Sequence, residues 1–180
     1  ANAFADMDVE GLVAEIAAAK DAALARMDAL FEEFKENASK AGVHVHLAQT
    51  AGEANAIIAH IARDNDVKKI VKSKSMVTEE IHLNAALETD DLEVVETDLG
   101  EFIIQLAGET PSHIIAPVMH KTRYDVGELF ADKLGVEYTD DPIELNGIAR
   151  HHLREIFLSA DMGISGCNVA IADSGSVVLV

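Results

Sequence analysis

The segment from Val67 to Ile81 constrains the fold of this chain more than any other stretch. Residues 67–71 are typical of a short buried strand, and two lysines and two serines, Lys72–Ser75, follow before a helical pattern begins. The first turn of a helix has free backbone N–H groups and the positive end of the helix dipole. We therefore predict an anion site at Lys72, Ser73, Lys74 and Ser75. The alternative is an ordinary capped helix, although basic residues are unfavourable at a helix N-terminus.

The rest of the chain alternates between helical and strand patterns. Apolar residues at helical spacing predict helices, and Thr50, Asp98, Thr122 and Asp141 are expected to cap four of them. The expected helices span residues 12–38, 50–61, 76–87, 98–106, 122–134 and 141–157, and the expected strands span residues 43–47, 67–71, 92–95, 112–116, 167–172 and 176–180. The last two strands flank 173–175, an Asp-Ser-Gly sequence that is typical of a hairpin turn.

Strands separated by helices predict an α/β fold, in which helices cover both faces of a parallel sheet. We expect this three-layer arrangement with an antiparallel C-terminal β-hairpin added. At 180 residues the chain is expected to be one domain, residues 1–180, with a helical N-terminal segment over residues 1–40. The apolar run Val177–Val180 has no stop signal, so we expect a buried strand there and a chain that continues beyond it.

Composition excludes several classes of function. A net charge of −18 argues against a nucleic-acid partner, because phosphate contacts need clustered Lys and Arg. No apolar run is long enough to span a membrane and no signal peptide opens the sequence, so a cytoplasmic location is expected. The single cysteine, Cys167, excludes an internal disulfide and is expected to be a buried thiol. His44 and His46 share a strand face without further ligands, so no metal site is predicted.

Polar residues follow several of the expected strands. In an open parallel sheet, ligands bind beyond the carboxyl ends of the strands, so loops 72–76, 96–101 and 117–122 should lie along one edge. A carboxylate beside a lysine can act as a base or a nucleophile, whereas the alternative is that these carboxylates cap helices or face water. The catalytic candidates are Glu79, Glu96 and Glu101. The crevice should also gather Lys72, Lys74, Asp98, His120 and Lys121, with Asn168, Ser174 and Ser176 as candidate polar lining.

Several long strings in this order resemble a known family. They are Val71–Ile81, Val94–Glu101, Pro111–Ile115, Phe157–Asn168 and Ser174–Val180. Together they resemble the lactate utilisation (LUD) domain, in the form found in the iron–sulfur subunits called lactate utilisation protein B. The resemblance covers the chain from about residue 20 to its end. The family's motif residues fall on Lys72–Ser75, Thr78–Glu80, Asn84, Glu96–Glu101, His120–Lys121 and Asn168.

The resemblance implies a fold similar to that of ribose-5-phosphate isomerase and the CoA transferases. It also implies a role in oxidising L-lactate to pyruvate within a cytoplasmic complex, with other lactate-utilisation subunits as partners. In such subunits two 4Fe-4S clusters lie in a ferredoxin-like region after the LUD domain. No cofactor is expected in this chain itself, because it has one cysteine and no Cys-x-x-Cys-x-x-Cys string.

Two other functions are compatible with the same residues. One is a self-sufficient acyl-CoA transferase that uses a glutamate nucleophile, Glu79, Glu96 or Glu101. The other is a non-catalytic module that binds a small organic acid or a nucleotide, although no Gly-x-Gly-x-x-Gly signature supports a dinucleotide. A fold alone does not choose among these functions, because one fold hosts many chemistries.

Overall fold

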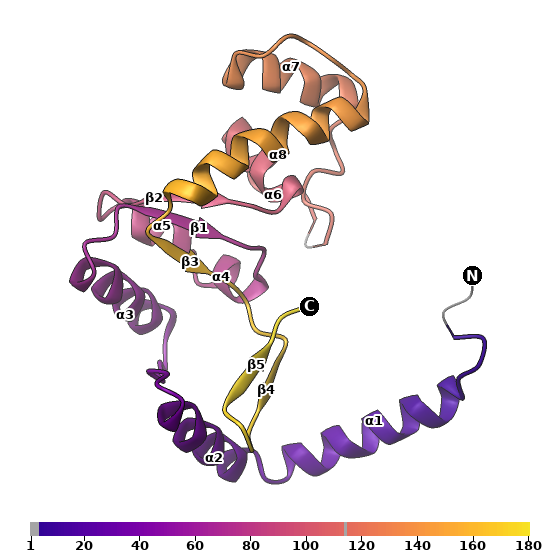
Figure 1. Ribbon diagram of the computed structural model, residues 1–180, viewed down its shortest axis with the longest axis vertical. Helices are drawn as coiled ribbons and strands as arrows, with labels where there is room; N and C mark the ends of the chain where they lie inside the picture. The colour runs from indigo at the N-terminus through magenta and orange to yellow at the C-terminus, as the bar shows by residue number, and fades with distance from the viewer. Residues whose placement is uncertain (1–3, 114) are drawn as a thin grey trace. The chain divides into compact units, whose positions relative to one another are not determined.

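The computed structural model describes residues 4–113 and 115–180 (Figure 1). The chain divides into two compact units, which are described separately. One unit comprises residues 47–166, and the other comprises the N-terminal segment to His46 together with Cys167–Val180. The larger unit contains the parallel sheet and most of the predicted site residues.

The sheet of the larger unit has three parallel strands, β1 (Lys69–Lys72), β2 (Glu93–Glu96) and β3 (Met162–Ile164), in the order β2-β1-β3. The central strand, β1, is the most deeply buried because it has a neighbour on each side. Its last residue, Lys72, lies opposite Glu96 of β2 and Ile164 of β3. The carboxyl ends of all three strands therefore meet at one edge.

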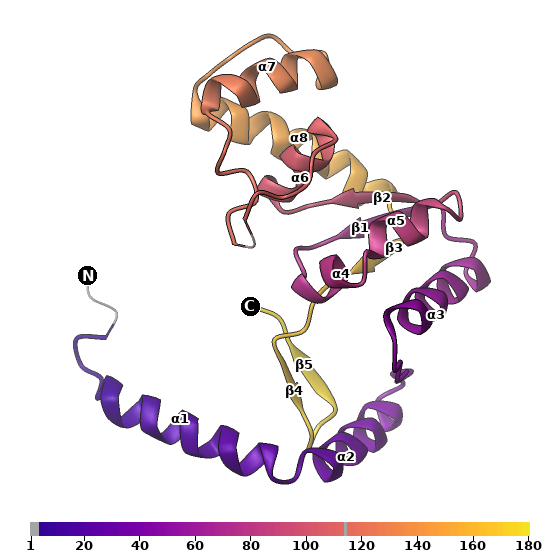
Figure 2. The ribbon, with the colours of Figure 1, turned by 180° about the vertical axis from the view of Figure 1, so that it is seen from behind.

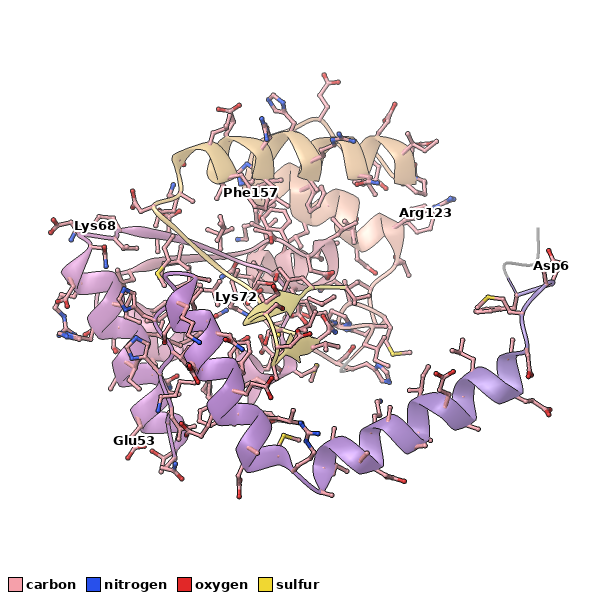
Figure 3. All side chains as sticks on the ribbon, turned by 60° about the horizontal axis from the view of Figure 1, so that its bottom comes forward. Asp6, Glu53, Lys68, Lys72, Arg123 and Phe157 are labelled. Atoms are coloured by element: carbon pink, nitrogen blue, oxygen red, sulfur yellow. The ribbon has the colours of Figure 1, made fainter. Side chains whose placement is uncertain are left out.

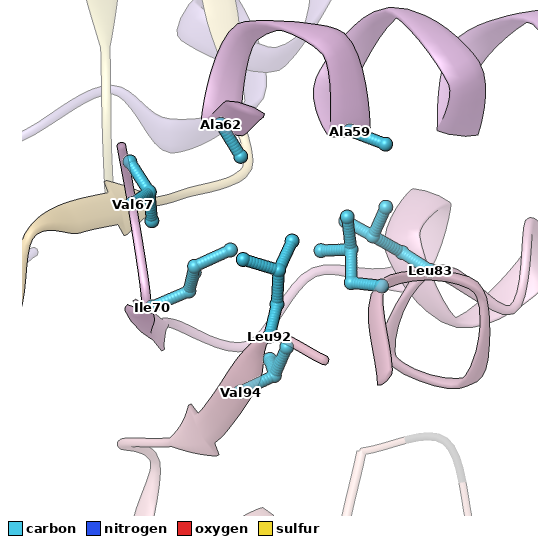
Figure 4. Packing of buried hydrophobic residues seen from close by; sticks show 8 residues of the cluster. Ala59, Ala62, Val67, Ile70, Leu83, Leu92 and Val94 are labelled. Atoms are coloured by element: carbon cyan, nitrogen blue, oxygen red, sulfur yellow. The ribbon is translucent and has the colours of Figure 1, made fainter. Parts of the chain in front are cut away.

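Helices cover both faces of this sheet, as Figure 2 shows from behind. On one face, α3 (Ala51–Asp64) and α5 (Leu83–Glu88) pack on Ile70 and Val94. The core there is made of small and branched side chains (Figure 4), including Ala59, Ala62, Val67, Leu83, Leu87 and Leu92. Thr50 caps α3 by accepting a hydrogen bond from the backbone of Glu53, as predicted. The short α4 (Met76–Glu80) precedes α5.

The opposite face carries α6 (Leu99–Ala107), α7 (Arg123–Leu134) and α8 (Pro142–Ser159). Val95 points to this face because successive strand residues alternate, and Phe102, Phe130, Leu145 and Leu153 complete the core. The predicted caps Asp98, Thr122 and Asp141 all accept hydrogen bonds from the first turns of these helices. The expected three-layer α/β arrangement is confirmed.

The smaller unit contains α1 (Val9–Leu24), α2 (Met27–Lys40) and an antiparallel hairpin of β4 (Val169–Ile171) and β5 (Ser176–Val178). The Asn37 side chain of α2 donates hydrogen bonds to the carbonyls of Ala172 (2.9 Å) and Asp173 (3.2 Å). Gly175 has φ +68°, and a side chain there would collide with the backbone of α2. The predicted hairpin is therefore confirmed and is held against α2 at its turn.

Two predicted helices are each broken into two. The helix expected over residues 12–38 is interrupted between Leu24 and Met27, which separates α1 from α2. The helix expected over residues 76–87 is interrupted at His82, whose φ of +52° is left-handed. Apolar spacing continues through both breaks, so the periodic pattern alone does not reveal them.

Four strand and burial predictions are wrong. Residues 43–47 alternate in polarity but pair with no other strand, and residues 112–116, as far as they are described, form a loop instead of a strand. Residues 177–180 are exposed, and so is Cys167, because apolar character does not by itself supply a covering layer. Conversely, β3 was not predicted, since three residues are too few to show a period.

Candidate functional site

The buried side chain of Lys72 organises the carboxyl edge of the sheet (Figure 3). Its Nζ lies 2.8 Å from Oε1 of Glu96, 3.2 Å from Oε1 of Glu79 and 3.1 Å from the hydroxyl of Thr78. The positions follow from strand geometry, because Lys72 and Glu96 each lie two residues after the core residues Ile70 and Val94 and so project from the same face. A fully buried ammonium is tolerated only when it is paired in this way.

Glu96 is as deeply buried as its lysine partner. Its Oε1 also accepts a hydrogen bond of 2.6 Å from Nδ2 of Asn84, and its backbone N–H donates to the side chain of Gln105. Within the described part of the chain, the other carboxylate oxygen, Oε2, and the Oδ1 atom of Asn84 are buried without a hydrogen-bond partner. Unpaired buried acceptors are unfavourable, so this corner of the site favours a hydrogen-bond donor from a ligand.

A second ion pair joins Lys74 to the first turn of α6. The Nζ atom of Lys74 is 3.5 Å from Oε1 of Glu101 and donates a 3.1 Å hydrogen bond to the carbonyl of Ile115. Burial raises the pKa of Glu101, and the negative charges of Glu79 and Glu96 raise it further, while Lys74 opposes the shift. We call Lys72, Lys74, Glu79, Glu96 and Glu101 the lysine–glutamate cluster.

The cluster borders a small cavity of about 230 Å³. Glu79 and Glu101 line it together with Met76, Pro111, Ser112 and His113. Nδ1 of His113 accepts hydrogen bonds from the backbone N–H groups of Ile115 (3.1 Å) and Ala116 (3.2 Å). Because Nδ1 is an acceptor, the neutral imidazole carries its proton on Nε2, which is then a donor.

The site residues at positions 73, 75 and 78 mainly hold the loop after β1. Ser75 caps α4 by accepting from the backbone of Thr78, and the Thr78 hydroxyl donates back to the Ser75 carbonyl at 2.8 Å. The hydroxyl of Ser73 donates to that of Ser165 at 3.0 Å. Asp98 caps α6. These contacts fix the backbone that carries both lysines, whose charges are met by carboxylates.

Two predicted crevice residues have a different partner. His120 and Lys121 both contact Glu109, at 2.7 Å and 2.6 Å, in a partly exposed group. Their hydrogen bonds lower the pKa of Glu109, with that from Lys121 the larger cause. Both residues are paired with Glu109, and their convergence with Lys72 on one crevice stays a prediction.

Asn168, Ser174 and Ser176 belong to the smaller unit and serve the hairpin. Oδ1 of Asn168 accepts a hydrogen bond from the backbone of Val180, and the Ser174 hydroxyl accepts one from the backbone of Ser176. Sequence reasoning missed His113 as a cavity residue because residues 112–116 were expected to form a strand. The only sequence signal for it was its place in the string Pro111–Ile115.

The model of the LUD domain family matches residues 31–180. The chain belongs to the LUD domain family. Lactate utilization protein B of Oceanobacillus iheyensis is 52% identical over 157 residues, and the proteins of that name from Bacillus thuringiensis and Bacillus cereus are 48% identical. Each match covers 87% of this chain and 33% of the relative, so the chain spans about a third of their length. No solved structure matches this LUD domain.

The resemblance places the iron–sulfur clusters in a region after the LUD domain, and the residues of this chain do not fit such a cluster. Cys167 is its only cysteine, whereas a cluster is generally held by about four ligands. Its thiol is exposed and contacts the carbonyl of Val169. Among residues 4–113 and 115–180, no helix combines the length and apolar character needed to cross a membrane.

Proposed function

We propose that this LUD domain serves lactate utilisation by binding a small 2-hydroxy acid at the lysine–glutamate cluster. The observation that carries the proposal is a small cavity lined by Glu79 and Glu101, with Glu79 held by the buried Lys72 that also pairs with Glu96. The relatives named lactate utilization protein B support lactate as the acid. A cavity of about 230 Å³ suits a ligand of few heavy atoms, since drug-sized ligands occupy roughly 300–1,000 Å³.

The cluster offers groups suited to such a ligand. Lys74 retains some solvent exposure and can exchange its contact with Glu101 for the carboxylate of the acid. Nε2 of His113 is a candidate donor to the same ligand. Glu101, whose pKa is raised, can hold a proton or accept one from the 2-hydroxyl group. Lys72 stays paired with Glu96 and positions Glu79.

We propose further that the domain works within a multi-subunit complex that oxidises L-lactate to pyruvate. This oxidation removes two electrons and two protons, and the residues of this chain handle binding and proton transfer only. The iron–sulfur centres that we propose to take the electrons would be held outside these 180 residues, which offer one thiol. Other lactate-utilisation subunits are the proposed partners.

Binding of L-lactate to the purified chain tests the proposal. Calorimetric titration should show binding that weakens in Lys74→Gln and Glu101→Gln by about 1–3 kcal/mol, the scale of a lost charged hydrogen bond. Lys133→Gln is the matched control, because Lys133 is an exposed lysine of α7 that pairs with its neighbour Asp132. Equal affinities in the wild type and all three variants would refute the site, and so would the absence of binding by the wild type.

A further inference from the structure

A second hollow lies on the larger unit, lined by residues other than those of the cavity at the lysine–glutamate cluster. It is a groove of about 660 Å³ between α8 and the start of α6. Thr97 and Leu99 line one side, and Asn146, Arg150, Arg154 and Phe157 of α8 line the other. Figure 3 labels Phe157 on α8. We call this hollow the arginine groove.

The arginine groove carries two positive charges. Arg150 and Arg154 are one helical turn apart and share a face, where like charges repel. Neither forms an ion pair with a carboxylate in the described part of the chain, whereas Arg63 pairs with Asp90 and Arg123 with Asp140. With 32 acidic and 14 basic residues in the chain, carboxylates are plentiful, so two adjacent unpaired guanidinium groups favour an external anion.

The short spacing of the two guanidinium groups favours an anion that both can bind at once. Two guanidinium groups one turn apart on a helix can both donate to a single group, and a phosphate dianion has the charge and the acceptor oxygens to engage both. Phe157 and Leu99 are 50% and 41% exposed and provide apolar surface beside the arginines. The volume is in the range of sites for compact organic ligands, roughly 300–1,000 Å³.

We infer that the arginine groove binds a small organic phosphate, with its phosphate on Arg150 and Arg154 and a planar or apolar body against Phe157. A small ligand is favoured over a nucleic acid, because a net charge of −18 repels a long polyanion. The inference does not depend on lactate binding at the lysine–glutamate cluster. The two places are nevertheless linked, since the backbone N–H and the hydroxyl of Thr97 both donate to the carbonyl of Lys72, at 2.9 Å and 3.0 Å.

Titration of the purified 180-residue chain with AMP and with inorganic phosphate tests the inference. AMP should bind more tightly than phosphate, and the double variant Arg150→Gln/Arg154→Gln should weaken AMP binding by at least about 10-fold, the scale of one lost charge-assisted hydrogen bond. Both arginines are exposed, so their replacement should leave the fold intact. Phe157→Ala should weaken AMP binding and leave phosphate binding unchanged.

The control is Arg63→Gln/Lys133→Gln, which removes the same charge from α3 and α7. AMP binding within twofold of wild type in this control would support a specific groove. An equal loss in both double variants would mean nonspecific charge attraction and would overturn the inference, as would no AMP binding by the wild type. Arginine-dependent binding of a glutamate-rich peptide, with no binding of AMP, would assign the groove to an acidic protein partner and overturn it too.

Discussion

Two groups of ionisable side chains follow the β-strands and helices of the larger unit, and they differ sharply in burial. In the lysine–glutamate cluster, Lys72 and Glu96 are almost completely inaccessible to solvent. In the group formed by Glu109, His120 and Lys121, the side chains of Glu109 and His120 are 40% and 37% exposed. Both groups contain hydrogen-bonded ion pairs near 2.7 Å, so distance does not distinguish them.

The comparison shows that the Lys72–Glu96 pair is buried because the two residues lie opposite each other on neighbouring strands. A position in the sequence shortly after a strand is not sufficient. Lys72 and Glu96 are opposite each other on neighbouring strands, and each continues a row of core side chains. His120 and Lys121 lie in a connection between α6 and α7, where no register fixes them. A buried pair is costly to break, whereas an exposed pair contributes little to stability.

The largest expected effect comes from removing the lysine at the centre of the cluster. Lys72→Ala should lower the free energy of unfolding by about 3–5 kcal/mol, because it leaves the charge of Glu96 buried and unpaired. Lys121→Ala is the comparison, and it should cost less, because its partner Glu109 is 40% exposed and water can solvate the carboxylate that is left behind. Urea unfolding followed by circular dichroism measures both. Similar losses for the two variants would mean that burial does not separate the groups.

Helix caps could be predicted from the sequence, whereas the pairing of strands that lie far apart in the sequence was only partly predictable. Thr50, Asp98 and Asp141 cap their helices as expected, since capping depends on a few adjacent residues. Strand β3 was missed because its identity comes from pairing with β1, which lies far away in the sequence. Residues 43–47 show the converse, an alternating pattern without a partner strand.

Some residues of the candidate site could likewise be predicted from the sequence, and others could not. A lysine after one strand and a glutamate after the next were correctly expected at one sheet edge, because parallel strands end together. His113 was not foreseen, since its place in the cavity depends on a loop that Ser112 closes by donating twice to the carbonyl of Pro117. Loop conformations of this kind depend on hydrogen bonds that no residue pattern displays.

A smaller effect should follow from removing a neutral partner of Glu96. Asn84→Ala deletes the 2.6 Å hydrogen bond to Oε1 of Glu96 and leaves Lys72 in place. We expect a loss of about 1–3 kcal/mol, the scale of one hydrogen bond to a buried charged group. Thr89→Ala provides the control, because the Thr89 hydroxyl donates to a backbone carbonyl in an exposed turn. The loss in the free energy of unfolding should be smaller for Asn84→Ala than for Lys72→Ala and larger than for Thr89→Ala. This order would show that the charged partner of Glu96 contributes more than the neutral one.

The smallest effect concerns the sign of the pH dependence in the two groups. The pKa of Glu101 is raised by burial and by neighbouring carboxylates, so the folded state holds its proton more tightly than the unfolded state. The stability that this provides is present below the unfolded pKa and is lost as pH rises through the folded pKa. The pKa of Glu109 is lowered by Lys121 and His120, so its stabilisation is present above the unfolded pKa and is lost as pH falls through the folded pKa.

Unfolding of Glu101→Gln and Glu109→Gln from below the ordinary glutamate pKa up to neutral pH measures this contrast. Relative to wild type, Glu101→Gln should gain stability as pH rises through the window above the ordinary glutamate pKa, because the variant has no proton to lose. Glu109→Gln should be less stable than wild type at neutral pH and should approach it as the medium becomes acidic. Parallel profiles for the two variants would mean that the buried cluster and the exposed group have the same electrostatic environment, which their burial and partners argue against.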